Sequence, residues 1–174
     1  MIFTETLLQG AFIIDLEKRG DERGFFARTF CANEFSAHGL KTTFVQGNMS
    51  KSVHKHTLRG MHYQIDGAEE AKLVRCTKGA LYDVILDMRE GSETFGNYFA
   101  TELSEENGRQ LYIPEGFAHG FCTLAENTEI AYLVTAFYAP GKEAGIRWND
   151  PTFGIQWPTE SPILSERDAG YGDY

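Results

Sequence analysis

Short apolar runs alternate with polar or glycine-containing turns along most of the chain. Residues 11–16 form one such run, a polar turn follows over 17–22, and a second apolar run covers residues 24–30. Turns spaced about ten residues apart are typical of a β-sandwich or a β-barrel. A parallel α/β sheet needs long amphipathic helices between its strands, and the pattern contains none, so it predicts an all-β domain.

The other predicted strands follow from the same pattern of apolar runs bounded by turns. They cover residues 43–46, 58–64, 73–76, 80–88, 98–103, 110–113, 117–124 and 129–138. One short helix is predicted over residues 33–38, with Asn33 as its N-cap and Gly39 after its end. Residues 48–57 are predicted to form a polar loop. From Trp148 onward, three prolines predict an irregular tail that lies across the surface of the sheet.

Length and composition bound the fold and its partners. The 174 residues are 42% hydrophobic and 13% aromatic, enough for one domain over residues 1–174 with a sizeable core. The net charge of −9 disfavours a nucleic-acid partner, which requires a basic surface. No apolar run is long enough to cross a bilayer, and residues 1–6 lack the features of a signal peptide. Three widely spaced cysteines are expected to be reduced, so we expect a cytoplasmic protein with no membrane partner.

The run over residues 58–64 brings several polar side chains into one strand. Lys72 begins the next strand, ten residues after His62. Taken singly, His62 is more often a hydrogen-bonded core histidine and Lys72 a strand-edge charge. Strict alternation divides the run into two faces, with Arg59, Met61 and Tyr63 on one and Gly60, His62 and Gln64 on the other.

A second cluster, Pro114-x-Gly116-x-x-His119, leads a histidine out of a tight turn into a strand. It matches the second half of the cupin signature, in which this histidine can bind a metal. The first half is defective, because His54-x-His56 lies in a Lys- and Ser-rich loop with no Glu soon after it. We therefore predict no metal. A metal-dependent cupin dioxygenase with His54, His56 and His119 as ligands stays open as an alternative.

Together these segments resemble the dTDP-4-dehydrorhamnose 3,5-epimerase family nearly from end to end. The family fold implies an all-β cupin jelly-roll barrel with short peripheral helices. It also implies a homodimer that works without metal or cofactor. The matching stretches, in order, are residues 20–26, 44–48, 58–64, 72–75, 113–121, 148–151, 155–158 and 164–168.

The resemblance also implies a role for individual residues. His62 matches the general base, Asp168 its carboxylate partner, Tyr132 the general acid and Lys72 the cation near the keto oxygen of the substrate. Phe137 or Tyr138 would stack on the nucleotide base. The remaining positions associated with nucleotide, phosphates or sugar are Arg23, Arg28, Gln46, Gly47, Asn48, Arg59, His119, Glu143 and Arg167.

Two positions depart from the family pattern. Arg28 stands where members that use thymidine commonly carry Glu, and a guanidinium cannot accept a hydrogen bond. Phe137 stands where Tyr is common. These two differences leave the identity of the nucleotide base open.

The expected substrate is a nucleotide diphosphate linked to a 4-keto-6-deoxyhexose. Inversion at C3, C5 or both would proceed by proton removal and return beside the ketone, and dTDP-4-dehydro-6-deoxyglucose is the favoured substrate. Three alternatives stay open besides the dioxygenase. They are a C3-only epimerase, a ketoisomerase acting on a different nucleotide sugar, and a non-catalytic protein that binds sugar nucleotides.

Overall fold

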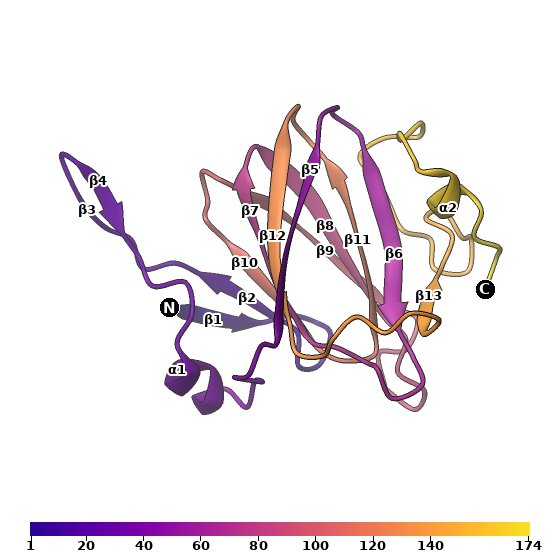
Figure 1. Cartoon of the computed structure of the whole chain (residues 1–174), viewed down its shortest axis with the longest axis horizontal. Helices are drawn as coiled ribbons and strands as arrows, with labels where there is room; N and C mark the ends of the chain where they lie inside the picture. The colour runs from indigo at the N-terminus through magenta and orange to yellow at the C-terminus, as the bar shows by residue number, and fades with distance from the viewer.

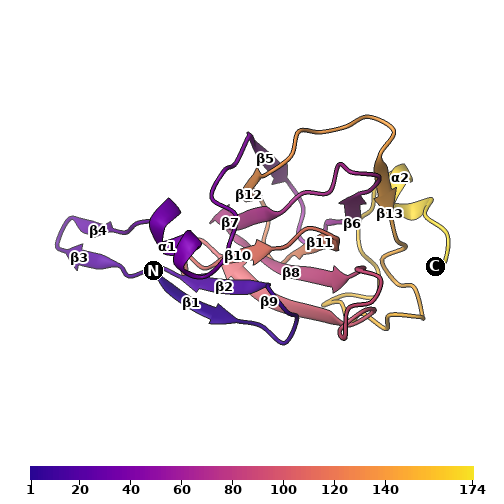
Figure 2. The same ribbon diagram turned by 90° about the horizontal axis from the view of Figure 1, so that it is seen from below.

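Two antiparallel sheets pack face to face in the computed structural model, which describes residues 1–174 (Figures 1 and 2). The larger sheet has the order β1 (Ile2–Glu5), β2 (Phe12–Asp15), β10 (Gln110–Ile113), β7 (Lys72–Lys78), β12 (Thr128–Val134) and β5 (Gln46–Ser52). The smaller sheet has the order β13 (Glu143–Gly145), β6 (Leu58–Gln64), β11 (Phe117–Thr123), β8 (Ala80–Asp87) and β9 (Tyr98–Ser104).

From β10 to β13 each successive strand crosses to the opposite sheet, which is the jelly-roll arrangement. Only two short helices accompany the strands, α1 (Ala32–Ala37) and α2 (Glu166–Ala169). The predicted all-β jelly-roll class is confirmed. No helix has the length and apolar character needed to cross a bilayer.

Three apolar clusters hold these layers together. The largest lies between the two sheets and includes Val74, Leu111 and Ile130. Helix α1 covers the outer face of the larger sheet, where the fully buried Phe35 packs. The segment after β13 covers the outer face of the smaller sheet through Ile146 and Phe153. Strand β11 is covered on both sides, and all of its residues are therefore buried.

Residues 48–57, predicted as a loop, instead contain most of strand β5. The strand was missed because its inward-facing side chains are polar. Asn48, Ser50 and Ser52 alternate with exposed neighbours and face the interior, so no apolar period marks the strand.

Other predicted boundaries also need correction. The strand predicted over 24–30 ends at Phe26, and the strand predicted over 129–138 ends at Val134. Helix α1 begins after Cys31, and no side chain caps its first turn, so the assignment of Asn33 as the N-cap is wrong. The tail from Trp148 is largely irregular as predicted, but it contains α2, which the sequence analysis missed.

A β-bulge interrupts the pairing of β6 with β11. His62 pairs with His119 and Arg59 pairs with Phe121, so Gly60 and Met61 together lie opposite a single residue, Gly120. The extra residue reverses the alternation of side chains on β6. Arg59 and His62 therefore face the same cavity, although strict alternation placed them on opposite faces.

Glycine is required at the bulge by both conformation and space. Gly60 has a φ of 131°, and a Cβ built there would lie 2.4 Å from the Cα of Gly120. Backbone atoms cannot yield at that distance, so the two strands approach this closely only because neither residue carries a side chain.

Replacing Gly60 with Ala should lower the free energy of unfolding by about 3 kcal/mol or more, because strain and overpacking add. Gly67→Ala is the matched control. Gly67 has a φ of 81°, with nothing within 4 Å of the added methyl group, so it should cost only about 1 kcal/mol. Urea unfolding of both variants measures the difference. Equal losses would show that contact with Gly120 is unimportant.

Candidate active site

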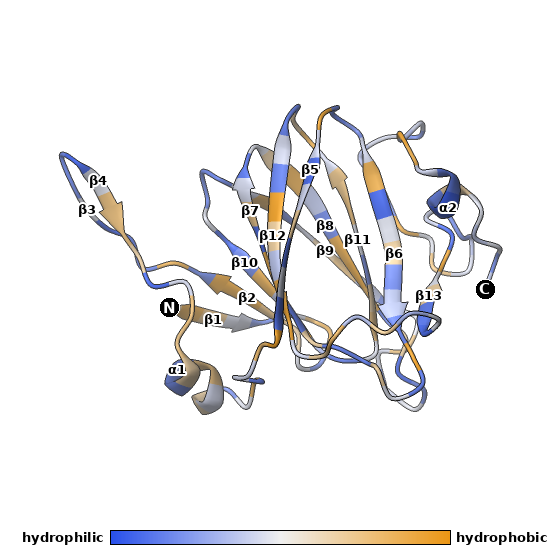
Figure 3. Cartoon of the chain, in the orientation of Figure 1, coloured by the Kyte–Doolittle hydropathy of each residue, from blue (hydrophilic) through white to orange (hydrophobic).

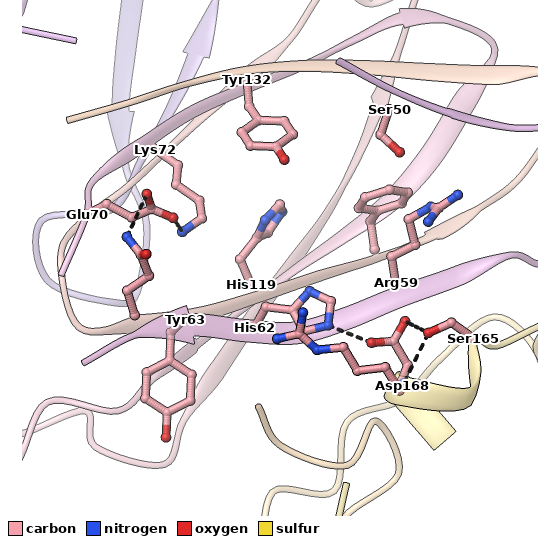
Figure 4. A pocket seen from close by; sticks show the side chains of 13 residues that line it. Ser50, Arg59, His62, Tyr63, Glu70, Lys72, His119, Tyr132, Ser165 and Asp168 are labelled. Atoms are coloured by element: carbon pink, nitrogen blue, oxygen red, sulfur yellow. Dashed lines mark hydrogen bonds and ion pairs between the residues drawn. The ribbon is translucent and has the colours of Figure 1, made fainter. Parts of the chain in front are cut away.

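A cavity of about 390 Å³ opens between the two sheets and is closed on one side by α2 (Figure 4). All four residues expected to carry the chemistry line it. They come from segments far apart in the sequence: His62 from β6, Lys72 from β7, Tyr132 from β12 and Asp168 from α2. Three of the predicted binding residues line the same cavity, namely Arg59, His119 and Arg167.

His62 and Asp168 form a hydrogen-bonded pair at one wall of the cavity. Nε2 of His62 lies 2.6 Å from Oδ1 of Asp168, and Asp168 is only 3% exposed. Ser165 caps α2 by accepting a hydrogen bond from the backbone N–H of Asp168, and its hydroxyl donates to Oδ2 of Asp168 at 2.9 Å. Both carboxylate oxygens are therefore held in place.

The electrostatic surroundings keep Asp168 ionised. Burial alone would raise the pKa of this carboxyl group, but the hydrogen bonds from His62 and Ser165 and the charge of Arg167 hold it below its ordinary value. An anionic Asp168 accepts the hydrogen bond from Nε2 and so fixes the orientation of the imidazole. Because the contact uses Nε2, the second ring nitrogen, Nδ1, is available to take a proton from a bound molecule.

Tyr132 reaches into the cavity from the larger sheet, on the opposite side from His62 (Figure 4). Burial raises the pKa of its phenol, the negative charge of Glu70 raises it further, and Arg59 partly offsets both effects. The hydroxyl is therefore neutral at physiological pH and can donate a proton.

Lys72 begins β7 and is 7% exposed. Its ammonium group forms an ion pair with Glu70, whose side chain also lines the cavity. Glu70 was not predicted as a site residue, because two adjacent glutamates before a strand ordinarily indicate a solvated turn. Ser165 was missed too, although Ser165-x-x-Asp168 is a recognisable helix start.

His119 forms a second histidine–aspartate pair beside the first. Its Nε2 lies 2.8 Å from Oδ1 of Asp83, which is fully buried, and Oδ2 of Asp83 has no hydrogen-bond partner. His119 is the cross-strand partner of His62, so the two rings come from adjacent strands. Arg59 lies nearer the surface, where its Nε donates to Ser52 at 3.3 Å.

Tyr171, which was not singled out, packs against the outer side of the dyad. Its ring centre lies 6.0 Å from that of His62 in an edge-on arrangement, and its hydroxyl accepts a hydrogen bond from Arg167 at 2.9 Å. The ring rests on Gly145, where a Cβ would come within 2.1 Å of it. The C-terminal segment thus covers His62 as well as supplying its partner.

Several other predicted binding residues lie around the rim of the cavity. Glu143 accepts a hydrogen bond from Arg167 at 3.2 Å, and hydrogen bonding between its carboxylate and the phenol raises the pKa of Tyr138. Phe137 and Tyr138 are 69% and 54% exposed. The Gln46 side chain accepts a hydrogen bond from the backbone of Tyr138 at 3.3 Å.

Gly47 and Asn48 line a separate hollow of about 320 Å³ rather than the main cavity. This hollow is also lined by Met49 and Leu133, so it lies on the outer face of the larger sheet, and strand β12 with Tyr132 separates it from the cavity. Gln46 donates to Asn48 at 3.0 Å.

The structure does not bring Arg23 and Arg28 to the cavity. Arg23 lies in the hairpin formed by β3 (Arg19–Asp21) and β4 (Gly24–Phe26), which projects from the barrel on the side opposite α2 (Figures 1 and 2). Arg23 pairs with Asp21, and Arg28 pairs with Glu34. Neither arginine therefore lines the cavity of its own chain, and their role in binding substrate stays a prediction.

The ligand set of the dioxygenase alternative is not assembled. His54 and His56 lie in the turn between β5 and β6, and the backbone of His56 bonds to Thr123 at the far end of β11 from His119. No group of three His, Cys, Asp or Glu side chains is arranged to hold a metal ion.

Known proteins resemble this chain over almost its whole length. A family model described as dTDP-4-dehydrorhamnose 3,5-epimerase matches residues 5–173. The dTDP-4-dehydrorhamnose 3,5-epimerase of Salmonella typhimurium is 47% identical over 171 residues, covering 97% of this chain and 93% of that protein.

Solved structures agree with the sequence match. The dTDP-4-dehydrorhamnose 3,5-epimerase of Elizabethkingia anophelis superimposes with a TM-score of 0.96 at 40% identity, covering 100% of this chain and 96% of that one. The dTDP-6-deoxy-D-glucose-3,5-epimerase of Legionella pneumophila was solved with dTDP-4-keto-L-rhamnose. It gives a TM-score of 0.91 at 41% identity, covering 98% of this chain and 90% of that one. With its fold, its cavity and its full-length similarity in agreement, this chain belongs to the dTDP-4-dehydrorhamnose 3,5-epimerase family.

Proposed function

We propose that this enzyme inverts C3 and C5 of dTDP-4-dehydro-6-deoxyglucose and so forms dTDP-4-dehydrorhamnose. The observation that carries the proposal is the placement of His62 and Tyr132 on opposite walls of one cavity, with Lys72 beside them. Inversion requires a base on one face of the sugar and an acid on the other. The substrate class follows from relatives that act on, or are solved with, dTDP-linked 4-keto sugars.

The chemistry depends on the ketone at C4. A proton on the neighbouring carbon is weakly acidic, because the carbanion left behind delocalises onto the keto oxygen as an enolate. His62 removes this proton, and Asp168 stabilises the imidazolium that forms. Lys72 donates to the enolate oxygen in a site where water is largely excluded, which strengthens the interaction. Tyr132 then returns a proton to the opposite face.

Arg59 and Arg167 provide the positive charge for the diphosphate. Both guanidinium groups line the cavity, and the side chain of Arg167 remains 53% exposed even with Glu143 bound to it. Planar guanidinium groups suit bidentate contacts with phosphate oxygens. The exposed Phe137 and Tyr138 rings at the rim are available to stack on the base.

We also propose that residues 1–174 act as one domain within a homodimer, in which the β3–β4 hairpin reaches the partner. The hairpin exposes Phe25 and Phe26 at 58% and 73%, and strand β4 is orange in Figure 3 on the barrel side of the hydrophilic tip. The outer face of β5 and β12 exposes Met49 at 71% and Leu133 at 37%. A second copy would cover these apolar surfaces, and the partner's hairpin would bring Arg23 and Arg28 to a substrate.

Replacing His62 with Ala should abolish solvent deuterium exchange at C3 and C5, with a loss of about 10³-fold. Tyr132→Phe should retain exchange, because the base remains, but should block inversion. NMR of dTDP-4-dehydro-6-deoxyglucose incubated in D₂O reads both effects. Full epimerase activity in Tyr132→Phe would contradict the two-face arrangement, and absence of exchange with the wild-type enzyme would contradict the proposed function.

Asp168→Asn should lower kcat by about 10²-fold, because an amide cannot stabilise the imidazolium.

The same substitution, Asp168→Asn, should also lower the free energy of unfolding at neutral pH. Since the folded-state pKa of Asp168 lies below its ordinary value of 3.8, the carboxylate stabilises the protein above about pH 4, and this contribution is lost as the pH falls through the folded pKa. The Tm difference from wild type should therefore shrink in acid. Asp173→Asn, in an exposed ion pair with Arg147, should leave kcat unchanged.

Complementation between two variants tests the hairpin. Arg23→Ala and His62→Ala homodimers should each be nearly inactive at substrate concentrations below KM. Coexpressed in equal amounts, they should recover about a quarter of wild-type activity, because half of the dimers are mixed and each has one intact site. Light scattering should show a dimer. Lack of recovery in a mixture that does form mixed dimers would mean that Arg23 does not act across the interface.

A further inference from the structure

Glu70 is a buried carboxylate inside the cavity that the mechanism above leaves without a role. Its side chain is 13% exposed, and it lies two residues before Lys72, where the connection from β6 enters β7. Its Oε1 accepts a hydrogen bond from the Lys72 ammonium, and its Oε2 accepts one from Nε2 of Gln64 at 3.2 Å (Figure 4). Both oxygens are therefore engaged.

Gln64 is itself firmly anchored. Its Nε2 also donates to the backbone oxygen of Ala68 at 2.9 Å, and its Oε1 accepts from the backbone N–H of Ala139 at 2.8 Å. Gln64 is 6% exposed, so these contacts are shielded from water. The backbone thus holds Gln64 in place, Gln64 holds Glu70, and Glu70 holds the Lys72 ammonium group.

We propose that Glu70 is a positioning residue that holds the Lys72 ammonium group at the place where the keto oxygen of the substrate becomes negative. This inference rests on the proposed function. An ammonium group has three N–H donors, and Glu70 is the only hydrogen-bond partner of the Lys72 ammonium group, so donors remain for the substrate. The lysine side chain has four rotatable bonds, and without a fixed partner it would not hold one position.

The charge of Glu70 contributes as well as its geometry. A buried ammonium group without a counter-charge is strongly disfavoured, and the carboxylate supplies that charge within the cavity. The same carboxylate faces Tyr132, where it helps to keep the phenol protonated. Glu70 does not act as a second base, because both of its oxygens already accept hydrogen bonds from neighbouring side chains.

Glu70→Gln separates positioning from binding. The amide has one acceptor oxygen in place of two, so either Lys72 or Gln64 loses its partner, and the counter-charge disappears. We expect kcat to fall by about 10-fold or more while KM changes by less than about 3-fold, because Arg59 and Arg167 still bind the diphosphate. Glu69→Gln removes the same charge from an exposed neighbour and should leave both constants unchanged.

A double-mutant cycle with Lys72→Met tests whether Glu70 acts through Lys72. In the Lys72→Met background, Glu70→Gln should change kcat by less than about 2-fold, because the group being positioned is gone. Additive losses would overturn the inference, as would a Glu70→Gln enzyme with wild-type kcat.

A second variant keeps the test decisive if Glu70→Gln folds poorly. Glu70→Asp retains the charge but withdraws it by one methylene group, and we expect a kcat loss of about 3-fold or more with an unchanged melting temperature. Wild-type kcat in Glu70→Asp would also overturn the inference. An active wild-type enzyme with insensitive Glu70 variants rejects this inference alone, whereas a wild-type protein without deuterium exchange rejects the proposed function.

Discussion

Gly60 and Gly120 meet where β6 passes β11, at a distance that leaves no room for a side chain on either residue. This contact allows β6 to carry one more residue than its neighbour, and the extra residue turns Arg59 to the same side as His62. The guanidinium proposed to bind the diphosphate and the imidazole proposed as the base therefore share one cavity. The rest of the site is arranged around this placement, with α2 bringing Asp168 to one side of His62 and β12 presenting Tyr132 from the other.

The interior of the barrel has two chemically different regions. One is the apolar cluster around Val74, Leu111 and Ile130, which supplies the main hydrophobic stabilisation. The other is the region around the cavity, where titratable side chains form pairs. His62 pairs with Asp168, Lys72 with Glu70, and His119 with Asp83. Pairing makes the burial of these charges tolerable. It also leaves a cavity partly shielded from bulk water, in which small movements of charge have large effects.

Much of this arrangement was predictable from the sequence, and the failures have physical causes. The strand of residues 58–64 and the start of β7 followed from apolar runs. The set of residues proposed to be catalytic followed from the family resemblance, and its four members line one cavity. The side of the strand on which Arg59 lies could not be predicted, because strict two-residue alternation does not reveal a β-bulge. Strand β5 was missed because it faces a polar cavity. The distance of Arg23 from the cavity of its own chain was not predictable either, because the sequence pattern does not distinguish a projecting hairpin from a packed one. Glu70 was missed because two adjacent glutamates before a strand ordinarily indicate a solvated turn, whereas the fold encloses Glu70 in the cavity together with Tyr132 of β12, which is distant in sequence.

The bulge also limits how this segment of the chain can diverge. Losing one residue between Arg59 and His62 would restore regular pairing of β6 with β11, and hydrogen bonding between the strands would improve. The same deletion would rotate one of these two side chains out of the cavity. Substitutions at positions of this stretch other than Gly60 can be accommodated one at a time, whereas an insertion or deletion exchanges the inner and outer faces of a strand in a single step. Relatives that retain the chemistry should therefore keep the length of this segment constant even where its composition changes.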